Sequence, residues 1–261
     1  MSIADDGRGG DGTPSPKMSP AGGQQPPPGP KRIFETAAAA ETDGGFALEL
    51  DGRRVRTPAR HVLMVPSRAL ADAVAAEWNA QGEHVDFQAM PLTRLSNTAL
   101  DNVRGREATI VEEIIGFAAS DLTCYRAERP ESLIAAQQNG WDPVHAWIAE
   151  RFGTRPIIVA GIMHADQPAS LLDALRDVLA AADPFILTAT HNFTTLTGSA
   201  FLGVGLLGAR FSPTDAWACA HIDEDWQAER WGHDAEAAAR RRYREGEFTS
   251  AYRFLTLHND R

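Results

Sequence analysis

His221 and Glu224, in the C-terminal quarter of the chain, have the types and spacing that could support metal chemistry. Residues three apart lie on the same face of an α-helix, and imidazole and carboxylate groups both ligate divalent cations. Further candidate ligands stand nearby, namely Asp223, Asp225, His233 and Asp234. The second histidine of an HExxH zinc motif is missing. The ligand set is therefore incomplete, and a metal-dependent hydrolase that uses the His221/Glu224 region remains only an alternative function.

A second string, Gly203-Val204-Gly205-Leu206-Leu207-Gly208, matches the GxGxxG pattern of dinucleotide-binding folds. That mechanism needs a strand before the glycines and a helix that begins at them. Here the glycines fall within an apolar helical pattern, so close packing between helices explains them better. Cys124 and His191 lack the neighbouring motif of a nucleophilic site. The sequence predicts no catalytic residue, no cofactor-binding residue and no metal ligand, and hence a protein that is not an enzyme.

The element that must position Glu224 is predicted as one helix over residues 212–232, from a serine cap to a terminal glycine. On this helix Glu224 lies midway between Trp217 and Trp231 on one apolar face. A carboxylate on such a face needs a partner inside the protein, a shifted pKa or a binding partner. Two explanations follow: a carboxylate paired inside a helical bundle, or an interface residue.

The remaining elements indicate an α+β fold, with a small N-terminal antiparallel sheet and helices followed by a C-terminal helical bundle. Apolar alternation over 46–50, the turn Asp51-Gly52 and a return strand at 55–57 predict a hairpin, and 61–65 predicts a third strand. The run at 156–159 predicts an isolated strand. Helices are predicted over these ranges: 67–82, 90–99, 106–119, 131–139, 142–152, 168–182, 183–195, 197–207 and 234–244.

Composition divides the chain into three parts. Residues 1–30 are rich in Gly and Pro and predict a disordered tail. Residues 31–125 predict an α/β domain, and residues 126–261 a helical domain in which the amphipathic segment 248–257 docks back onto the rest. The full length of 261 residues, 43% of them hydrophobic, suits such an organisation.

Charge and hydropathy exclude several classes of partner. The net charge of -10 argues against binding to nucleic acid and to anionic membrane surfaces. No apolar run reaches the roughly 18 residues that span a bilayer, so no membrane insertion is predicted. The two cysteines lie far apart without metal-binding or disulfide patterns, which favours a cytoplasmic protein.

Several strings, taken together and in order, resemble one known family, the assembly chaperones for the catalytic head of the F-type ATP synthase. The strings are Lys31-Arg32, Gly45-Phe46, Arg56-Thr57-Pro58, Glu77-Trp78-Asn79-Ala80-Gln81, Met90-Pro91-Leu92-Thr93, Asn97-Thr98-Ala99, Cys124-Tyr125-Arg126-Ala127, Trp141-Asp142-Pro143, Glu224-Asp225-Trp226-Gln227 and Trp231-Gly232. The resemblance covers most of the chain after residue 30. It implies a molecular chaperone without cofactor that binds the unassembled α-subunit and shields its interface until the β-subunit replaces it.

The resemblance also implies a site. A functionally sensitive glutamate in the C-terminal helix of that family corresponds to Glu224, with Asp223, Asp225 and Glu229 as competing positions. The partner-binding residues that the resemblance implies are Glu224, Asp223, Gln227 and Trp231.

Overall fold

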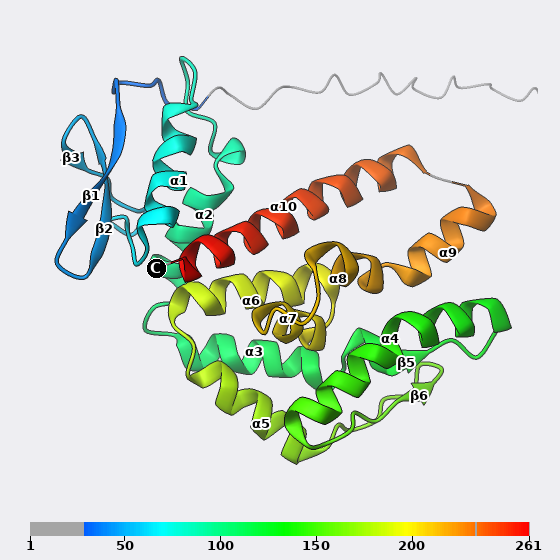
Figure 1. Ribbon diagram of the computed structural model, residues 1–261. Coiled ribbons are helices and arrows are strands. Elements are labelled where there is room, and N and C mark those ends of the chain that lie inside the picture. Colours follow the sequence, from blue (N-terminus) through cyan, green and yellow to red (C-terminus); the bar gives the residue numbers. More distant parts are fainter. Residues whose placement is uncertain (1–28, 233, 261) are drawn as a thin grey trace, which may run out of the picture.

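The computed structural model describes residues 29–232 and 234–260 (Figure 1). The predicted tail, residues 1–30, lies outside these residues except at its last two positions. The fold is the predicted α+β fold: a small antiparallel sheet lies at one end of the molecule and helices make up the rest.

The sheet is built around β2 (Gly45–Leu50), which pairs antiparallel with β1 (Ala37–Thr42), β3 (Arg53–Arg54) and β4 (Met64–Val65). The predicted hairpin at Asp51-Gly52 is confirmed, with positive φ at both turn residues. Strand β1 is not predicted from the sequence, because its run of alanines has little strand propensity. The Asp43-Gly44 turn that joins β1 to β2 was the available signal.

Helix α1 (Arg68–Asn79) covers the sheet, and its buried side chains, among them Leu70, Val74 and Trp78, join those of β2 in the core. Glu77 of α1 accepts bonds from the backbone N–H groups of Leu92 and Thr93, which are free donors at the start of α2 (Pro91–Thr98). A short π-helical turn, η2 (Ala99–Val103), follows α2, and α3 (Glu107–Ala119) leads into the helical part. A 3-10 turn, η1 (Phe87–Ala89), precedes α2.

The helical part is assembled around α7 (Ala200–Leu207), which is buried along nearly its whole length. Around it lie α3, α4 (Glu131–Phe152), α6 (Pro184–Thr197) and α8 (Pro213–Ala220). Helix α5 (Ala169–Ala180) packs on α3 and α4. Gly203 and Gly205 of the GxGxxG string therefore lie inside a buried helix, and Gly208 is its exposed C-cap. The expectation of close packing between helices is confirmed, because a Cβ at Gly203 would lie 2.8 Å from Thr194 Oγ1.

Replacing Gly205 by alanine is expected to lower the free energy of unfolding by about 1–3 kcal/mol, because the added Cβ would overlap the Phe211 ring. The matched control is Gly116→Ala in α3, where a Cβ meets nothing within 4 Å. There the gain in helix propensity should stabilise the protein by about 0.5–1 kcal/mol. Urea denaturation of both variants checks the opposite signs, and two stabilising substitutions would contradict the packing explanation.

Four predicted boundaries were wrong. Residues 131–139 and 142–152 form one helix, α4, which continues through Pro143. Residues 234–244 and 248–257 are likewise one helix, α10 (Ala235–Asn259), which tolerates Gly246. The strand predicted at 156–159 is not isolated, since β6 (Val159–Ala160) pairs parallel with β5 (Tyr125–Arg126). Helix α7 begins after Gly198, whose positive φ ends α6, and not at residue 197.

A fifth error concerns residues 212–232, which are not one helix. Helix α8 ends before His221, and α9 (Ile222–Trp231) begins after it. The Nδ1–H of His221 donates to the carbonyl of Trp217 at 2.8 Å, and a side chain that bonds the preceding turn competes with the helical backbone. Trp217 is buried and Trp231 is exposed, so the single Trp217–Trp231 face does not exist.

The C-terminal half of α10 runs back to the sheet end of the molecule (Figure 1), as predicted for residues 248–257. It buries Phe248, Phe254 and Leu255 and accepts a bond from Ser67 Oγ at the Leu257 carbonyl. Contacts between α10 and the N-terminal part thus cross the predicted domain boundary between residues 125 and 126. The division into two domains stays a prediction. Within the described residues, no helix is long and apolar enough to cross a membrane.

Candidate functional site

The candidate site lies in a segment whose side chains are not buried. We call this segment the arm: α9 together with residues 234–247. No described residue from 222 to 247 is buried. The arm lies at the end of the molecule opposite the sheet (Figure 1). It is nevertheless anchored, because Ile222 lies against Gly140 of α4 and Trp226 Nε1 donates to Ser132 Oγ at 3.2 Å.

A groove of about 560 Å³ runs between the two helices of the arm. From α9 it is lined by Glu224, Gln227, Ala228 and Trp231, and from α10 by Ala237, Ala238, Arg240, Arg241 and Arg244. Trp231 is 74% exposed, with its ring edge-on to Trp226. An exposed indole beside charged groups is typical of a protein-binding surface, where tryptophan and arginine are frequent anchors.

The carboxylate of Glu224 faces this groove with its side chain 62% exposed. Its nearest described cationic candidate is His221, whose Nε2 lies 3.9 Å away. His221 is neutral at pH 7, because burial lowers its pKa and its single proton is on Nδ1, bonded to Trp217. Glu224 is therefore an exposed carboxylate without a close cationic partner among the described residues. The explanation of a carboxylate paired inside a bundle does not fit this geometry.

The neighbouring acids are held differently. Asp225 forms a two-bond ion pair with Arg241, which joins α9 to α10. Asp223 Oδ1 accepts a bond of 2.7 Å from Nε2 of Gln137 on α4. Glu229 is exposed but does not line the groove. The structure thus brings Glu224, Gln227 and Trp231 together on one side of α9 and places Asp223 on the side toward α4.

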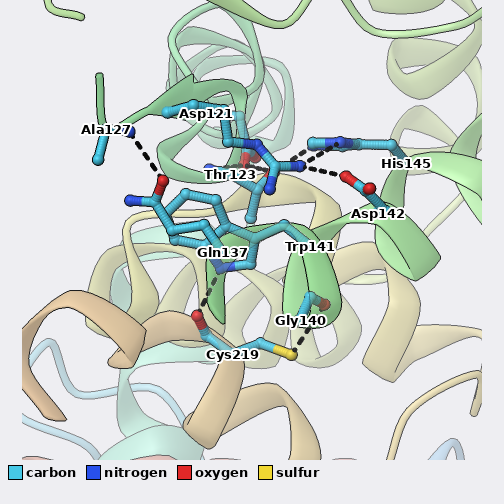
Figure 2. Close-up of polar contacts among 10 residues, drawn as sticks. Asp121, Thr123, Ala127, Gln137, Gly140, Trp141, Asp142, His145 and Cys219 are labelled. Carbon is cyan, nitrogen blue, oxygen red and sulfur yellow. Dashed lines mark hydrogen bonds and ion pairs between the residues drawn. The ribbon is translucent and has the colours of Figure 1, made fainter. Parts of the chain in front are cut away.

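Polar contacts of α4 connect it to β5 and to α8 (Figure 2), and Gln137 extends these contacts to α9 of the arm. Gln137 links Asp223 to the backbone N–H of Ala127, and Trp141 Nε1 donates to the Cys219 carbonyl at 2.7 Å. The Arg126 guanidinium lies over the Trp141 ring and donates to Asp142. The sequence alone did not predict that Gln137, Trp141 and Arg126 hold neighbouring elements in position. The signal was present in the strings Cys124-Tyr125-Arg126-Ala127 and Trp141-Asp142-Pro143, which meet in the fold.

A second buried group, Asp121, fixes the start of α7. Its carboxylate accepts bonds from Thr123 N and Oγ1, Ser199 Oγ and Phe201 N, at 2.8–3.0 Å. Burial raises its pKa to about 6, against the effect of these donors. Thr123 lies in the 3-10 turn η3 (Leu122–Cys124), so Asp121 joins the β5 region to the central helix.

The metal alternative gains no support from the geometry. In residues 29–232 and 234–260 there is no group of three or more His, Cys, Asp or Glu side chains that could hold a metal ion. His221 is turned toward Trp217, Asp223 toward Gln137 and Asp225 toward Arg241. His233, a further candidate ligand, lies outside the described residues.

Comparisons with known proteins agree with one another. The family model of the ATP12 chaperone protein matches residues 31–149. The mitochondrial atp12 protein of Schizosaccharomyces pombe is 22% identical over 219 residues, which is 79% of this chain and 75% of that protein.

Solved structures of two bacterial proteins match with a TM-score of 0.84 each. Atu1473 of Agrobacterium tumefaciens is 44% identical, with 87% of this chain and 85% of that chain covered. Atp12 of Paracoccus denitrificans is 38% identical, with 88% and 98% covered. An aspartate-to-lysine mutant of the Paracoccus protein matches equally well.

Proposed function

This chain belongs to the ATP12 chaperone family, and from that premise we propose that it binds the unassembled α-subunit of the F-type ATP synthase and shields its interface until the β-subunit replaces it. The single observation that carries the proposal is the arm. Helix α9 and residues 234–247, none of whose described residues is buried, present a carboxylate and an indole to a groove.

In this proposal Glu224, Gln227 and Trp231 contact the client, and Asp223 holds α9 in position through Gln137. The groove combines the Glu224 carboxylate with the guanidinium groups of Arg240 and Arg244. Such mixed charge fits a specific polar client surface better than indiscriminate binding of apolar chains, because charged groups select partners by complementarity.

The protein would act by binding alone, without a chemical step and without nucleic acid as a partner. A cytoplasmic location is part of the proposal for this chain, whereas the Schizosaccharomyces relative is named as mitochondrial.

A test uses purified α- and β-subunits of the synthase. The proposal expects that an equimolar amount of this protein suppresses light scattering by the isolated α-subunit on warming, and that added β-subunit displaces it. Equal scattering with and without the protein, or binding to β-subunit but not to α-subunit, would contradict the proposal.

A further inference from the structure

We infer that a second surface, residues 157–163 with the hollow beside them, binds an apolar extended segment of the same client; this inference rests on the proposed function. We call residues 157–163 the apolar loop. In the described part of the chain, eight large apolar side chains are exposed, and four of them lie in this loop: Ile157, Ile158, Ile162 and Met163. Clusters of exposed apolar side chains of this kind mark interaction surfaces.

The apolar loop is held in a fixed conformation. The buried side chain of Gln167 donates to the Ile157 carbonyl at 2.8 Å and accepts from the Ile157 N–H at 2.9 Å. Within the loop, Gly161 N–H donates to the Arg126 carbonyl at 2.8 Å. Because these bonds hold the backbone of Ile157 and of Gly161, a partner that binds there has less entropy of ordering to offset.

The backbone beside the loop favours an extended partner. β6 lies within the loop and pairs with β5 only, so this two-stranded sheet has open edges among the described residues. An open edge next to apolar side chains is the arrangement that accepts an added strand, in which the main chain provides affinity and alternate side chains provide specificity.

The loop is continuous with the arm. A hollow of about 660 Å³ beside it is lined by Tyr125, Arg129, Gly161, Ile162 and also Asp223 of α9. Consecutive residues of a helix point about 100° apart, so Asp223 and Glu224 face different sides of α9. Helix α9 therefore lies between the hollow and the groove, and one client that covers α9 reaches both.

The size of α9 by itself also favours a further contact with the client. The exposed face of α9 is about 15 Å long and about 10 Å wide. This is small beside the roughly 800 Å² that each partner buries in a stable complex. A client interface that the β-subunit will later cover has apolar surface to offer, and the apolar loop shares a hollow with Asp223 of α9.

The double variant Ile162→Glu/Met163→Glu tests the inference. These side chains are 95% and 77% exposed, so the melting temperature should not change. Affinity for purified α-subunit, measured by calorimetry, should fall at least about tenfold, because two apolar side chains no longer bury their surface. Ile33→Glu is the matched control: Ile33 is 92% exposed but lines neither the groove nor the hollow, and affinity should not change.

Other outcomes separate the inference from the proposed function. If wild-type protein binds the α-subunit and the double variant binds equally well, the apolar loop is not a client site and the proposed function stands. If wild-type protein does not bind the α-subunit at all, the proposed function itself fails. If the double variant loses self-association, or binding to phosphatidylcholine/phosphatidylserine vesicles, while its affinity for α-subunit stays unchanged, the occupant is a second copy or a lipid surface and the inference is overturned.

Discussion

Replacing Glu224 by lysine is expected to lower the affinity for the α-subunit by roughly 30-fold or more, because loss or reversal of an interface charge costs about 2 kcal/mol or more. The fold should stay intact. The Glu224 side chain is 62% exposed and makes no hydrogen bond to a described residue, and the guanidinium of Arg241, whose pKa Glu224 helps to raise, bonds to Asp225 instead. The change in unfolding free energy should remain within about 0.5 kcal/mol.

Two variants on the same helix serve as controls. Glu229→Lys makes the same substitution at an exposed position outside the groove and should bind like wild type. Asp223→Lys should instead lower stability, because it leaves the buried Gln137 amide without its acceptor. A Glu224→Lys protein that binds as tightly as wild type would remove Glu224 from the interface. One that melts far below wild type would restore the alternative of a structural carboxylate.

Replacing Asp121 by alanine is expected to produce the largest loss of stability, about 3–5 kcal/mol, because buried donors on Thr123, Ser199 and Phe201 lose their common acceptor. Urea denaturation at constant pH measures it. Asp173→Ala is the matched control. Asp173 pairs with Arg176 on the surface, and its loss should cost under about 1 kcal/mol.

The effect of Asp121 should also depend on pH. Burial raises its folded-state pKa to about 6, above the unfolded value of about 3.9. Between these values the folded protein binds more protons, so the contribution of the carboxyl group to stability is greatest below pH 4 and falls as the pH rises through 6. Asp121→Ala should therefore cost about 1 kcal/mol more at pH 5 than at pH 7.5. A cost that grows with pH would contradict the raised pKa.

Most helices and turns could be predicted because the residues that begin or end them act on neighbours a few positions away in the sequence. The turn at Asp51-Gly52 and the serine cap at 212 each act within a few residues, and each is found in the structure. The errors arose where tertiary contacts override a local signal. Gly140 reads as a stop within α4, but its missing side chain makes room for Ile222, 82 residues later in the chain.

The candidate site was predicted for a partly wrong reason. Glu224 was singled out because a carboxylate seemed to interrupt one apolar face, yet His221 ends α8 and divides that face. Helical periodicity assumes an unbroken helix. It could not predict the hydrogen bond from the His221 side chain to the Trp217 carbonyl, at the point where α8 ends. Nor could the sequence show that Gln137 holds Asp223 and that Arg241 holds Asp225, contacts that single out Glu224 among the neighbouring acids.

The central claim, that the groove face of α9 contacts the α-subunit, is tested most directly by site-specific photo-crosslinking. A photoreactive amino acid replaces Gln227, which is exposed and lines the groove, or Asp72, which is exposed on α1 near the sheet at the other end of the molecule (Figure 1). The account predicts a covalent adduct with the α-subunit from position 227 and none from position 72. A complex that forms but crosslinks only from position 72, or equally from both, would contradict it.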